Sequence, residues 1–188
     1  MEKYLQQQKT DCIKIVLFGP ESTGKTSLAV ELAKHYKTLF VKEFAREFLQ
    51  KKMDEQNKVC EIDDLIPIAI GQMNSENILS KKANRILFCD TDLLTTATYS
   101  RLYFNNFCDP VIDKYSKENK YDLYLLLDID IPWVKDDLRD RPNDRKLFLE
   151  NFKEALIKNH KPFKLISGNF KERLKTVSYT HLTLPTNC

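Results

Sequence analysis

The sequence lacks the features that define several large classes of protein. No apolar run approaches the length needed to cross a membrane, and residues 1–11 are too polar for a secretory signal peptide. The five cysteines are odd in number, irregularly spaced and free of any C-x-x-C pair, so we expect a reduced cytoplasmic protein rather than a disulfide framework. The net charge is only +3, with acidic and basic residues interspersed, so neither a nucleic-acid partner nor a membrane partner is indicated.

Glycine is also scarce, at four residues in 188, yet two of the four bracket one short turn. The segment 19–26, GPESTGKT, matches the pattern G-x-x-x-x-G-K-[ST] and lies between an apolar run and an amphipathic helical pattern. In such a loop, backbone N–H groups meet phosphate oxygens, aided by the positive end of the following helix. Lys25 can reach the β- and γ-phosphates of ATP, and the Thr26 hydroxyl can ligate Mg²⁺. The predicted ATP-binding residues of this loop are Gly19, Pro20, Glu21, Ser22, Thr23, Gly24, Lys25, Thr26 and Ser27.

Apolar segments of strand length alternate with helical sequence along the chain. Because the strands are apolar on both faces, they predict a parallel sheet covered by helices on both sides, with right-handed crossovers. The predicted fold is α/β, a three-layer P-loop NTPase fold of the kinase type, with ligands at the carboxyl ends of the strands and a lid at about 130–145. Strands are predicted at 12–18, 38–44, 85–90, 122–129 and 162–167, a long helix at 63–83 and a loop at 50–60.

The chain divides into three predicted segments. Residues 1–12 form an N-terminal extension, 13–176 the P-loop kinase domain, and 177–188 a tail that does not look native. The tail, VSYTHLTLPTNC, breaks the preceding helical pattern without turn chemistry and resembles the read-through of sequencing-adapter DNA. We therefore exclude it from the fold prediction and expect the native last helix to be truncated there.

Motifs that are missing or misplaced indicate whether the γ-phosphate is transferred to water or to another acceptor. The segment NKYD at 119–122 spells an NKxD guanine reader, but it precedes a predicted strand and so belongs at the edge opposite the ligands. No D-x-x-G sequence occurs, and the third strand ends in DTD at 90–92, without the adjacent glutamate that would polarise water. Transfer to a bound acceptor hydroxyl is the option left, so the sequence predicts a small-molecule kinase.

Such a kinase needs metal ligands, a base for the acceptor hydroxyl and cations around the transferred phosphoryl group. Asp90 ends the third strand, where it can hold Mg²⁺ directly or through water. Glu43, at the end of the second strand, and Asp92 are both candidates for the base. Arginines of the 130–145 segment can hold phosphate oxygens bidentately. The predicted catalytic residues are Lys25, Glu43, Asp90, Asp92, Arg139, Arg141 and Arg145, and the predicted metal ligands are Thr26 and Asp90.

Each of these side chains has a purely structural alternative. Asp90 could cap the next helix, and Glu43 with Arg46 could form an i,i+3 surface pair. The lid arginines alternate with aspartates, as in a solvated charged loop. Trp133, the only tryptophan, could stack on a flat ring in the acceptor pocket or pack into the core. Asn169, just after the fifth strand, is expected to touch the nucleobase of ATP.

Four segments together carry a family resemblance: FGPESTGKTSLAVELA, VKEFAREFL, ILFCDTDLLTTATYS and YDLYLLLDIDIPWVKDDLRDRPNDRKLFLENF. Through them the chain resembles, from about residue 13 to residue 173, the ribosylnicotinamide kinase domain of the NadR family, also grouped as an AAA domain. The resemblance implies that ATP and Mg²⁺ serve to phosphorylate the 5′-hydroxyl of nicotinamide riboside, giving nicotinamide mononucleotide in NAD salvage. It also implies a riboside site that contains Glu43, Arg46, Asp92 and Trp133.

The chain departs from the full NadR architecture. Only a dozen residues precede the first strand, which leaves no room for a helix-turn-helix or an adenylyltransferase domain, and no H-x-G-H sequence occurs. Transcriptional repression and conversion of the mononucleotide to NAD are therefore not expected. Two alternatives stay open: another nucleoside or nucleotide kinase, and a nucleotide-dependent switch protein without transfer activity. A homo-oligomer is compatible with the sequence.

Overall fold

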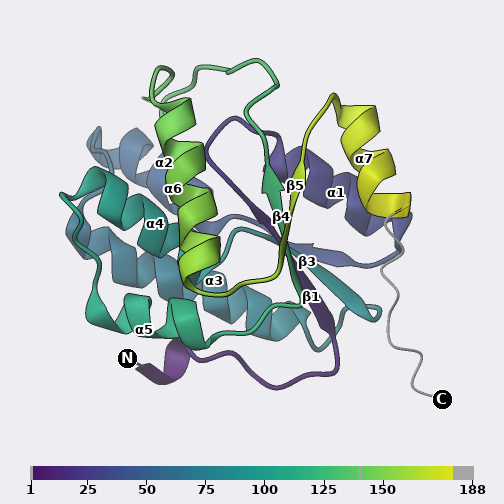
Figure 1. Cartoon of the computed structure of the whole chain (residues 1–188). Coiled ribbons are helices and arrows are strands. Elements are labelled where there is room, and N and C mark those ends of the chain that lie inside the picture. Colours follow the sequence, from purple (N-terminus) through teal and green to yellow (C-terminus); the bar gives the residue numbers. More distant parts are fainter. Residues whose placement is uncertain (1, 140, 180–188) are drawn as a thin grey trace.

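The protein is built on one five-stranded parallel sheet (Figure 1). The computed structural model describes residues 2–139 and 141–179, and in this part of the chain the strand order is β2-β3-β1-β4-β5. Every neighbouring pair is parallel, so all five carboxyl ends lie at one edge of the sheet. The strands are β1 (Ile13–Phe18), β2 (Leu39–Val41), β3 (Ile86–Asp90), β4 (Leu123–Leu127) and β5 (Phe163–Ile166).

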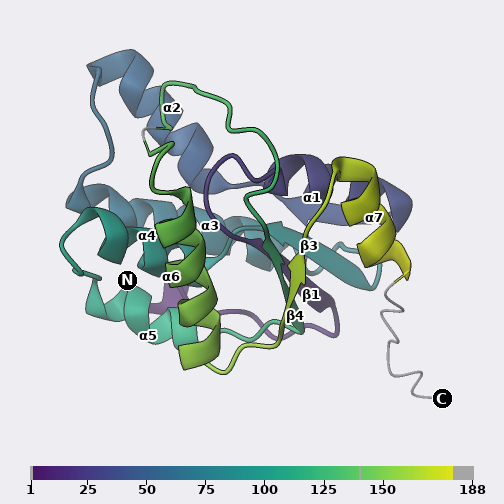
Figure 2. The ribbon, with the colours of Figure 1, turned by 45° about the horizontal axis from the view of Figure 1, so that its top comes forward.

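Helices cover both faces of the sheet, as expected for parallel strands (Figures 1 and 2). Helices α1 and α7 pack on one face, whereas α3, α4 and α6 pack on the other, where α2 contacts α3 and α5 contacts α4. Two short 3₁₀ helices, η1 (Glu2–Tyr4) and η2 (Ile62–Asp64), precede β1 and α3. The α-helices are α1 (Lys25–His35), α2 (Phe44–Gln56), α3 (Leu65–Leu79), α4 (Leu93–Tyr103), α5 (Pro110–Glu118), α6 (Arg145–Lys158) and α7 (Phe170–Tyr179).

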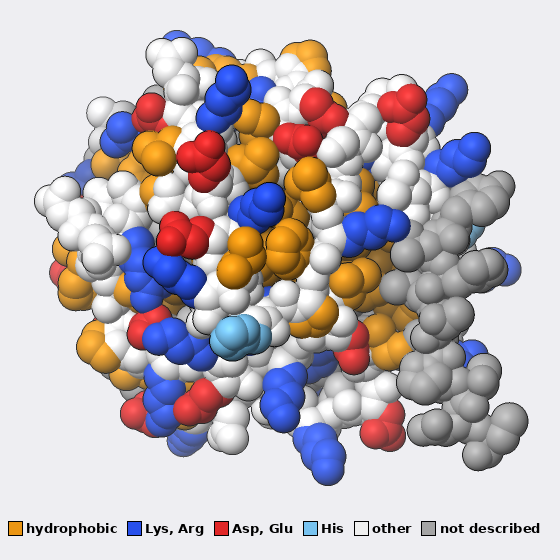
Figure 3. All heavy atoms as spheres, in the orientation of Figure 1, with side chains coloured by type: hydrophobic (Ala, Val, Ile, Leu, Met, Phe, Trp, Pro, Cys, Tyr) orange, Lys and Arg blue, Asp and Glu red, His pale blue; other side chains and the backbone are white. Residues whose placement is uncertain are grey.

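The core divides according to the alternation of side chains along each strand. In β1, Ile15 and Leu17 face α1 and α7, whereas Val16 and Phe18 face α4 and α6. Because both sets are buried, the strands read as continuous apolar runs in the sequence. A third apolar cluster joins α3, α4, α5 and Leu5 of the N-terminal segment. Figure 3 shows that apolar and charged side chains are interspersed on the face formed by α6 and β5.

The NKYD segment lies before β4, at the edge opposite the phosphate loop, as predicted. The Asn119 side chain donates to Leu5 O at 3.2 Å and accepts from Gln7 N at 3.3 Å. The Asp122 carboxylate accepts from Lys14 N at 2.8 Å. These hydrogen bonds hold the N-terminal segment and the start of β1, so Asn119 and Asp122 have structural partners at this edge of the sheet.

The predicted loop at 50–60 is wrong for its first seven residues, because α2 continues to Gln56. Its exposed turns carry i,i+4 partners, in which Gln50 donates to Asp54 at 3.0 Å and Lys51 pairs with Glu55 at 3.8 Å. Asn57 follows as the C-cap residue and adopts a left-handed conformation with φ 53°. The polar sequence of this segment led to the prediction of a loop, whereas pairs between its side chains stabilise a helix.

The last helix also runs further than predicted. Helix α7 continues to Tyr179, and Val177, only 1% exposed, packs in the cluster beneath α1. The expected break at 177 is therefore not observed, while the rest of the predicted non-native tail, 180–188, lies outside the described residues. Within the described part of the chain, no helix is long and apolar enough to span a membrane.

Candidate functional site

The phosphate loop connects β1 to α1 and needs glycine at both ends. Gly19 adopts φ 134°, and a Cβ atom there would lie 3.0 Å from Leu127 O. Gly24 adopts φ 81°, and its Cβ would lie 3.2 Å from the Ile131 side chain. No described side chain caps the N-terminus of α1, so its first N–H groups are available to an anion.

Lys25 folds back over the loop that precedes it. Its ammonium group donates to Gly19 O at 3.0 Å and to Pro20 O at 2.8 Å. The side chain is buried, and its acceptors are neutral carbonyls rather than a carboxylate. A strongly charged phosphate would therefore be a better partner for Lys25 than the groups that now hold it.

Asp90 lies at the end of β3, where the sheet register places it opposite Leu17 and beside the loop. The Thr26 hydroxyl donates to Asp90 Oδ2 at 2.5 Å, whereas Asp90 Oδ1 is buried without a hydrogen-bond partner among the described residues. Burial, and then repulsion from Glu43, raise the pKa of Asp90 from 3.8 to about 6, although Lys25 and Thr26 act in the opposite direction. A buried carboxylate oxygen without a partner, next to a hydroxyl, fits a hard cation such as Mg²⁺.

A cavity of about 730 Å³ extends from this loop across the carboxyl edge of the sheet. One end is polar and is lined by residues 21–27 with Glu43 and Arg46, which begin α2. The other end reaches between α2, α3 and α4 and carries the apolar side chains Leu49, Val59, Leu65, Ile68 and Phe104. The space therefore joins an anion-binding loop to a chamber of the size of a small organic ligand.

The two aspartates of the DTD segment face different surroundings. Between them, Thr91 adopts φ 76°, a strained conformation for a β-branched residue that turns the chain sharply. Asp92 Oδ1 accepts from Thr95 N and Thr95 Oγ1, both at 2.9 Å, and its Oδ2 accepts from Tyr124 OH at 2.7 Å. Asp92 thus forms a capping box at the start of α4 and is not among the described residues that line the cavity.

The predicted lid, residues 130–145, contains no helix or strand before α6 in its described part and reaches over to α2 (Figure 2). The Arg46 guanidinium pairs with both carboxylate oxygens of Asp136, at 3.1 and 2.8 Å, so the predicted alternative of a Glu43–Arg46 pair is not what holds Arg46. Arg139 pairs with the same Asp136 at 3.2 Å and lines the cavity. Arg141 pairs with its neighbour Asp144 at 3.4 Å.

Three other predicted residues are not among the described residues that line the cavity. Arg145 donates to Ser22 O at 3.3 Å and to Ile131 O at 3.0 Å. Trp133 donates to the Glu21 carboxylate at 3.4 Å and is not among the described lining residues of the cavity. Asn169 caps α7 by accepting from the backbone N–H groups of residues 171 and 172, at 3.0 and 3.2 Å.

Two residues of the site were missed from the sequence. Gln72 of α3 lines the cavity, accepts from Phe44 N at 2.8 Å and donates to Thr91 O at 3.4 Å. Its signal was present, because Gln72 and Glu76 are polar residues four apart on an otherwise apolar helical stripe. Arg173 of α7 is buried and bonds the phosphate loop, but a single arginine in a charged helical segment gave no signal.

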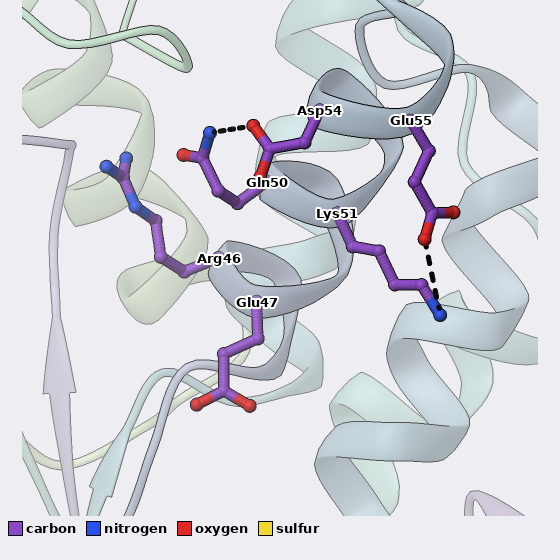
Figure 4. Close-up of a pocket in the computed structure, with 6 residues that line it drawn as sticks. All are labelled: Arg46, Glu47, Gln50, Lys51, Asp54 and Glu55. Carbon is purple, nitrogen blue, oxygen red and sulfur yellow. Dashed lines mark hydrogen bonds and ion pairs between the residues drawn. The ribbon is translucent and has the colours of Figure 1, made fainter.

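A second depression, of about 470 Å³, lies on the outer face of α2 (Figure 4). It shares Arg46 with the main cavity, and Figure 4 shows Gln50 bonded to Asp54 and Lys51 to Glu55 along its wall. Because these polar groups pair with one another on one helix, the depression is a charged helix surface rather than a second candidate site.

The phosphate loop, the strand order and the cavity at the carboxyl edge define a P-loop nucleotide-binding fold of the kinase type. A family model described as an AAA domain matches residues 14–173, and the chain belongs to that family. Over 154 residues it is 30% identical to the trifunctional NAD biosynthesis/regulator protein NadR of Salmonella typhimurium, an alignment that covers 79% of this chain. The same alignment covers 37% of the relative, so the chain spans well under half of that protein.

Solved structures agree with this assignment. A NadR protein in complex with NR matches with a TM-score of 0.74 at 24% identity, over 89% of this chain and 50% of that one. A deoxyadenosine kinase from M. mycoides matches with a TM-score of 0.62 at 16% identity, over 88% of this chain and 96% of that one. The predicted P-loop kinase fold and the resemblance to NadR are therefore confirmed.

Proposed function

We propose that this protein is an ATP-dependent kinase that phosphorylates the 5′-hydroxyl of nicotinamide riboside to give nicotinamide mononucleotide. The observation that carries the proposal is the single cavity that joins the phosphate loop to an apolar chamber. A nucleotide hydrolase needs room only for water beyond the γ-phosphate, whereas this chamber has room for a second organic ligand. The similarity to NadR makes nicotinamide riboside the first acceptor to test.

ATP would bind through its phosphates at the polar end. Backbone N–H groups of the loop and of the start of α1 would meet the phosphate oxygens, and Lys25 would exchange its two carbonyl acceptors for the β- and γ-phosphates. Thr26 and Asp90 would hold Mg²⁺, and the buried oxygen of Asp90 that lacks a partner among the described residues supports this assignment. The bound cation supplies charge neutralisation around the transferred phosphoryl group.

Glu43 is the proposed base. It lines the cavity, whereas both oxygens of Asp92 are already engaged by Thr95 and Tyr124. The 5′-oxygen of the acceptor attacks the γ-phosphorus, and the bond from the γ-phosphorus to the oxygen that bridges to the β-phosphate breaks. ADP leaves with that electron pair, and the hydroxyl proton passes to the Glu43 carboxylate. Asp92 would then act by holding the start of α4 in place.

The arginines of the lid would neutralise the transferred group. Arg139 and Arg141 are paired with aspartates, and the phosphates of ATP would compete with these carboxylates for the guanidinium groups. Trp133 bonds the loop residue Glu21. From this position it would form one wall of the acceptor site, next to the triphosphate. Asn169, at the carboxyl end of β5, is the proposed contact to the nucleobase of ATP.

The test is an ADP-release assay with nicotinamide riboside, with a panel of ordinary nucleosides and with water alone. We expect release to depend on nicotinamide riboside, and mass spectrometry to identify the mononucleotide as the product. The Lys25→Ala variant serves as the control for contaminating activity and should release no ADP above background. Equal ADP release with and without any acceptor would exclude the proposal.

Another nucleoside kinase activity is the second candidate. It is favoured by the match to a deoxyadenosine kinase, which this chain covers over almost its whole length. The same panel separates the two candidates, because phosphorylation of a deoxynucleoside in preference to nicotinamide riboside would select the second one.

A further inference from the structure

Arg173 of α7 is a charged side chain buried outside the cavity. It is only 2% exposed, and it ranks first by volume among the fully buried side chains of the described residues. Its guanidinium donates to Thr23 O at 2.6 Å, to Gly168 O at 2.8 Å and to Asp128 O at 3.0 Å, and it also donates to the Asp130 carboxylate. One planar group with five N–H donors thus joins the phosphate loop to the segments that follow β4 and β5.

The contact with Thr23 fixes the direction of one peptide group in the loop. All peptide bonds of the described residues are trans, and in a trans peptide the C=O and the next N–H point in opposite directions. Arg173 holds the Thr23 carbonyl, so the N–H of Gly24 points away from Arg173, and Gly24 itself lines the cavity. Gly24 is at φ 81°, where glycine has alternative conformations of similar energy, so this orientation needs a constraint from outside.

A second arginine constrains the preceding peptide group in the same way, by a hydrogen bond to its carbonyl oxygen. Arg145 donates to Ser22 O at 3.3 Å, which turns the N–H of Thr23 away from that arginine. Thr23 is itself fully buried, with its hydroxyl donating to Pro20 O at 2.8 Å. Two arginines from α6 and α7 therefore hold consecutive carbonyls of the loop.

We propose that Arg173 is a positioning residue that orients the Gly24 N–H for phosphate binding, and that it links the loop to the turn between β5 and α7. The proposal rests on the proposed function only in taking ATP as the ligand. Asp130 completes the link, because its second oxygen accepts from Gly168 N while the first accepts from Arg173. Lysine could not replace this arginine, because a compact ammonium cannot span acceptors on three separate segments.

The scarcity of glycine makes the proposal directly measurable. A sample labelled with ¹⁵N only at glycine gives four amide signals, from Gly19, Gly24, Gly71 and Gly168. In the wild-type protein we expect the Gly24 signal to be sharp before ATP is added and to move to a hydrogen-bonded position when ATP and Mg²⁺ bind. In Arg173→Lys and Arg173→Met we expect the Gly24 signal to broaden or move without ATP, while Gly71, in α3, stays in place as a report on the fold.

ATP affinity, measured by isothermal titration calorimetry, should fall about tenfold or more in both variants, because a charge-assisted hydrogen bond no longer orients a ligand-binding group. Arg101→Lys is the matched control, because Arg101 also bonds a backbone carbonyl and a carboxylate, Asp113, but lies outside this machinery. It should change neither the Gly24 signal nor the ATP affinity. If Arg173→Met does not fold, Arg173→Lys and Asp130→Asn decide the question with the same signals.

The outcomes separate this inference from the proposed function. If the wild-type protein does not bind ATP, the proposed function fails, whereas a displaced Gly24 signal in the ligand-free variants still supports the positioning role. If ATP affinity and the Gly24 signal of the folded Arg173 variants match those of the wild-type protein, the positioning role is overturned while the kinase proposal stands.

Discussion

Two carboxylates of this protein, Glu76 and Asp90, are both fully buried, but they differ in how their oxygens are used. Glu76 Oε1 is held by Lys14 at 3.2 Å and by Gln7 at 2.8 Å, and its Oε2 is held by Tyr121 at 2.7 Å. Asp90 has one oxygen held by the Thr26 hydroxyl, and its other oxygen has no partner among the described residues.

The difference gives Glu76 a structural role and supports the proposed role of Asp90 as a metal ligand. A buried charge is tolerated when its partners replace the water that it loses, which is the condition around Glu76. Asp90 fails that condition, and it bonds Thr26 of the phosphate loop, a residue that lines the cavity. An unsatisfied carboxylate that persists at such a place is explained if a ligand or a cation completes its coordination. The comparison therefore predicts opposite consequences for neutralising the two residues.

Glu76→Gln should give the largest effect, and on stability alone. Removing one charge of a buried pair leaves Lys14 uncompensated, so the free energy of unfolding should fall by about 3–5 kcal/mol. Urea denaturation measures this loss, and the turnover number of the folded fraction should be unchanged. In the double variant Lys14→Met/Glu76→Leu, most of the stability should return, because no charge is left unpaired. A large loss of turnover in folded Glu76→Gln would contradict the purely structural role given to Glu76.

Asp90→Asn should give the opposite result. The amide keeps the shape and can still bond Thr26, but it is a poor ligand for Mg²⁺, so turnover should fall about 10²- to 10³-fold. Stability of the ligand-free protein should not fall, because the variant removes a desolvated charge that Glu43 repels. Steady-state kinetics with thermal unfolding of the same samples checks both parts. Full activity of Asp90→Asn would contradict the proposed metal role.

The pKa of Asp90 gives a third prediction, for the metal-free protein. Burial and Glu43 raise this pKa from 3.8 to about 6, against Lys25 and Thr26, so the native state binds a proton more tightly than the unfolded state. The contribution of Asp90 is therefore most favourable below pH 4 and is lost as pH rises through 6, a change of about 3 kcal/mol.

This third prediction is measured as the difference in stability between the wild-type protein and Asp90→Asn, across pH 4–7 in the presence of a chelator. The wild-type protein should lose stability relative to the variant as pH rises. Parallel stability curves for the two proteins would show that Asp90 does not carry the shifted titration.

Much of the fold could be predicted from the sequence, for identifiable reasons. The three central strands β3, β1 and β4 are buried along almost their whole length, and the parallel arrangement of all five strands follows from the helices between them. The loop glycines lie in a fixed motif whose spacing specifies the turn. The helical extension of α2 was missed because charged i,i+4 pairs stabilise a helix without leaving an apolar stripe.

The site was predictable where one local segment forms it, and less so where distant segments meet. Lys25, Thr26 and Asp90 lie as predicted, because strand ends meet at one edge of the sheet. Asp92 differs because the left-handed Thr91 redirects the chain, and no sequence pattern specifies that conformation for threonine. Arg173 is separated from Thr23 by 150 residues, so its contact arises only from the folded topology.

The smallest expected effect concerns the Arg46–Asp136 pair, which joins α2 to the lid and is partly exposed. Because water screens such a pair, its coupling should be only about 0.2–1 kcal/mol. Asp136→Asn should therefore raise the KM of the acceptor roughly two- to fivefold at unchanged kcat, since the lid loses one contact that holds it over the cavity.

The exposed pair Lys51–Glu55 on the outer face of α2 provides the control, and Glu55→Gln should change neither constant (Figure 4). A double-mutant cycle with Arg46→Gln measures the coupling directly. A hundredfold loss of kcat in Asp136→Asn would instead place Asp136 among the groups that touch the reacting atoms.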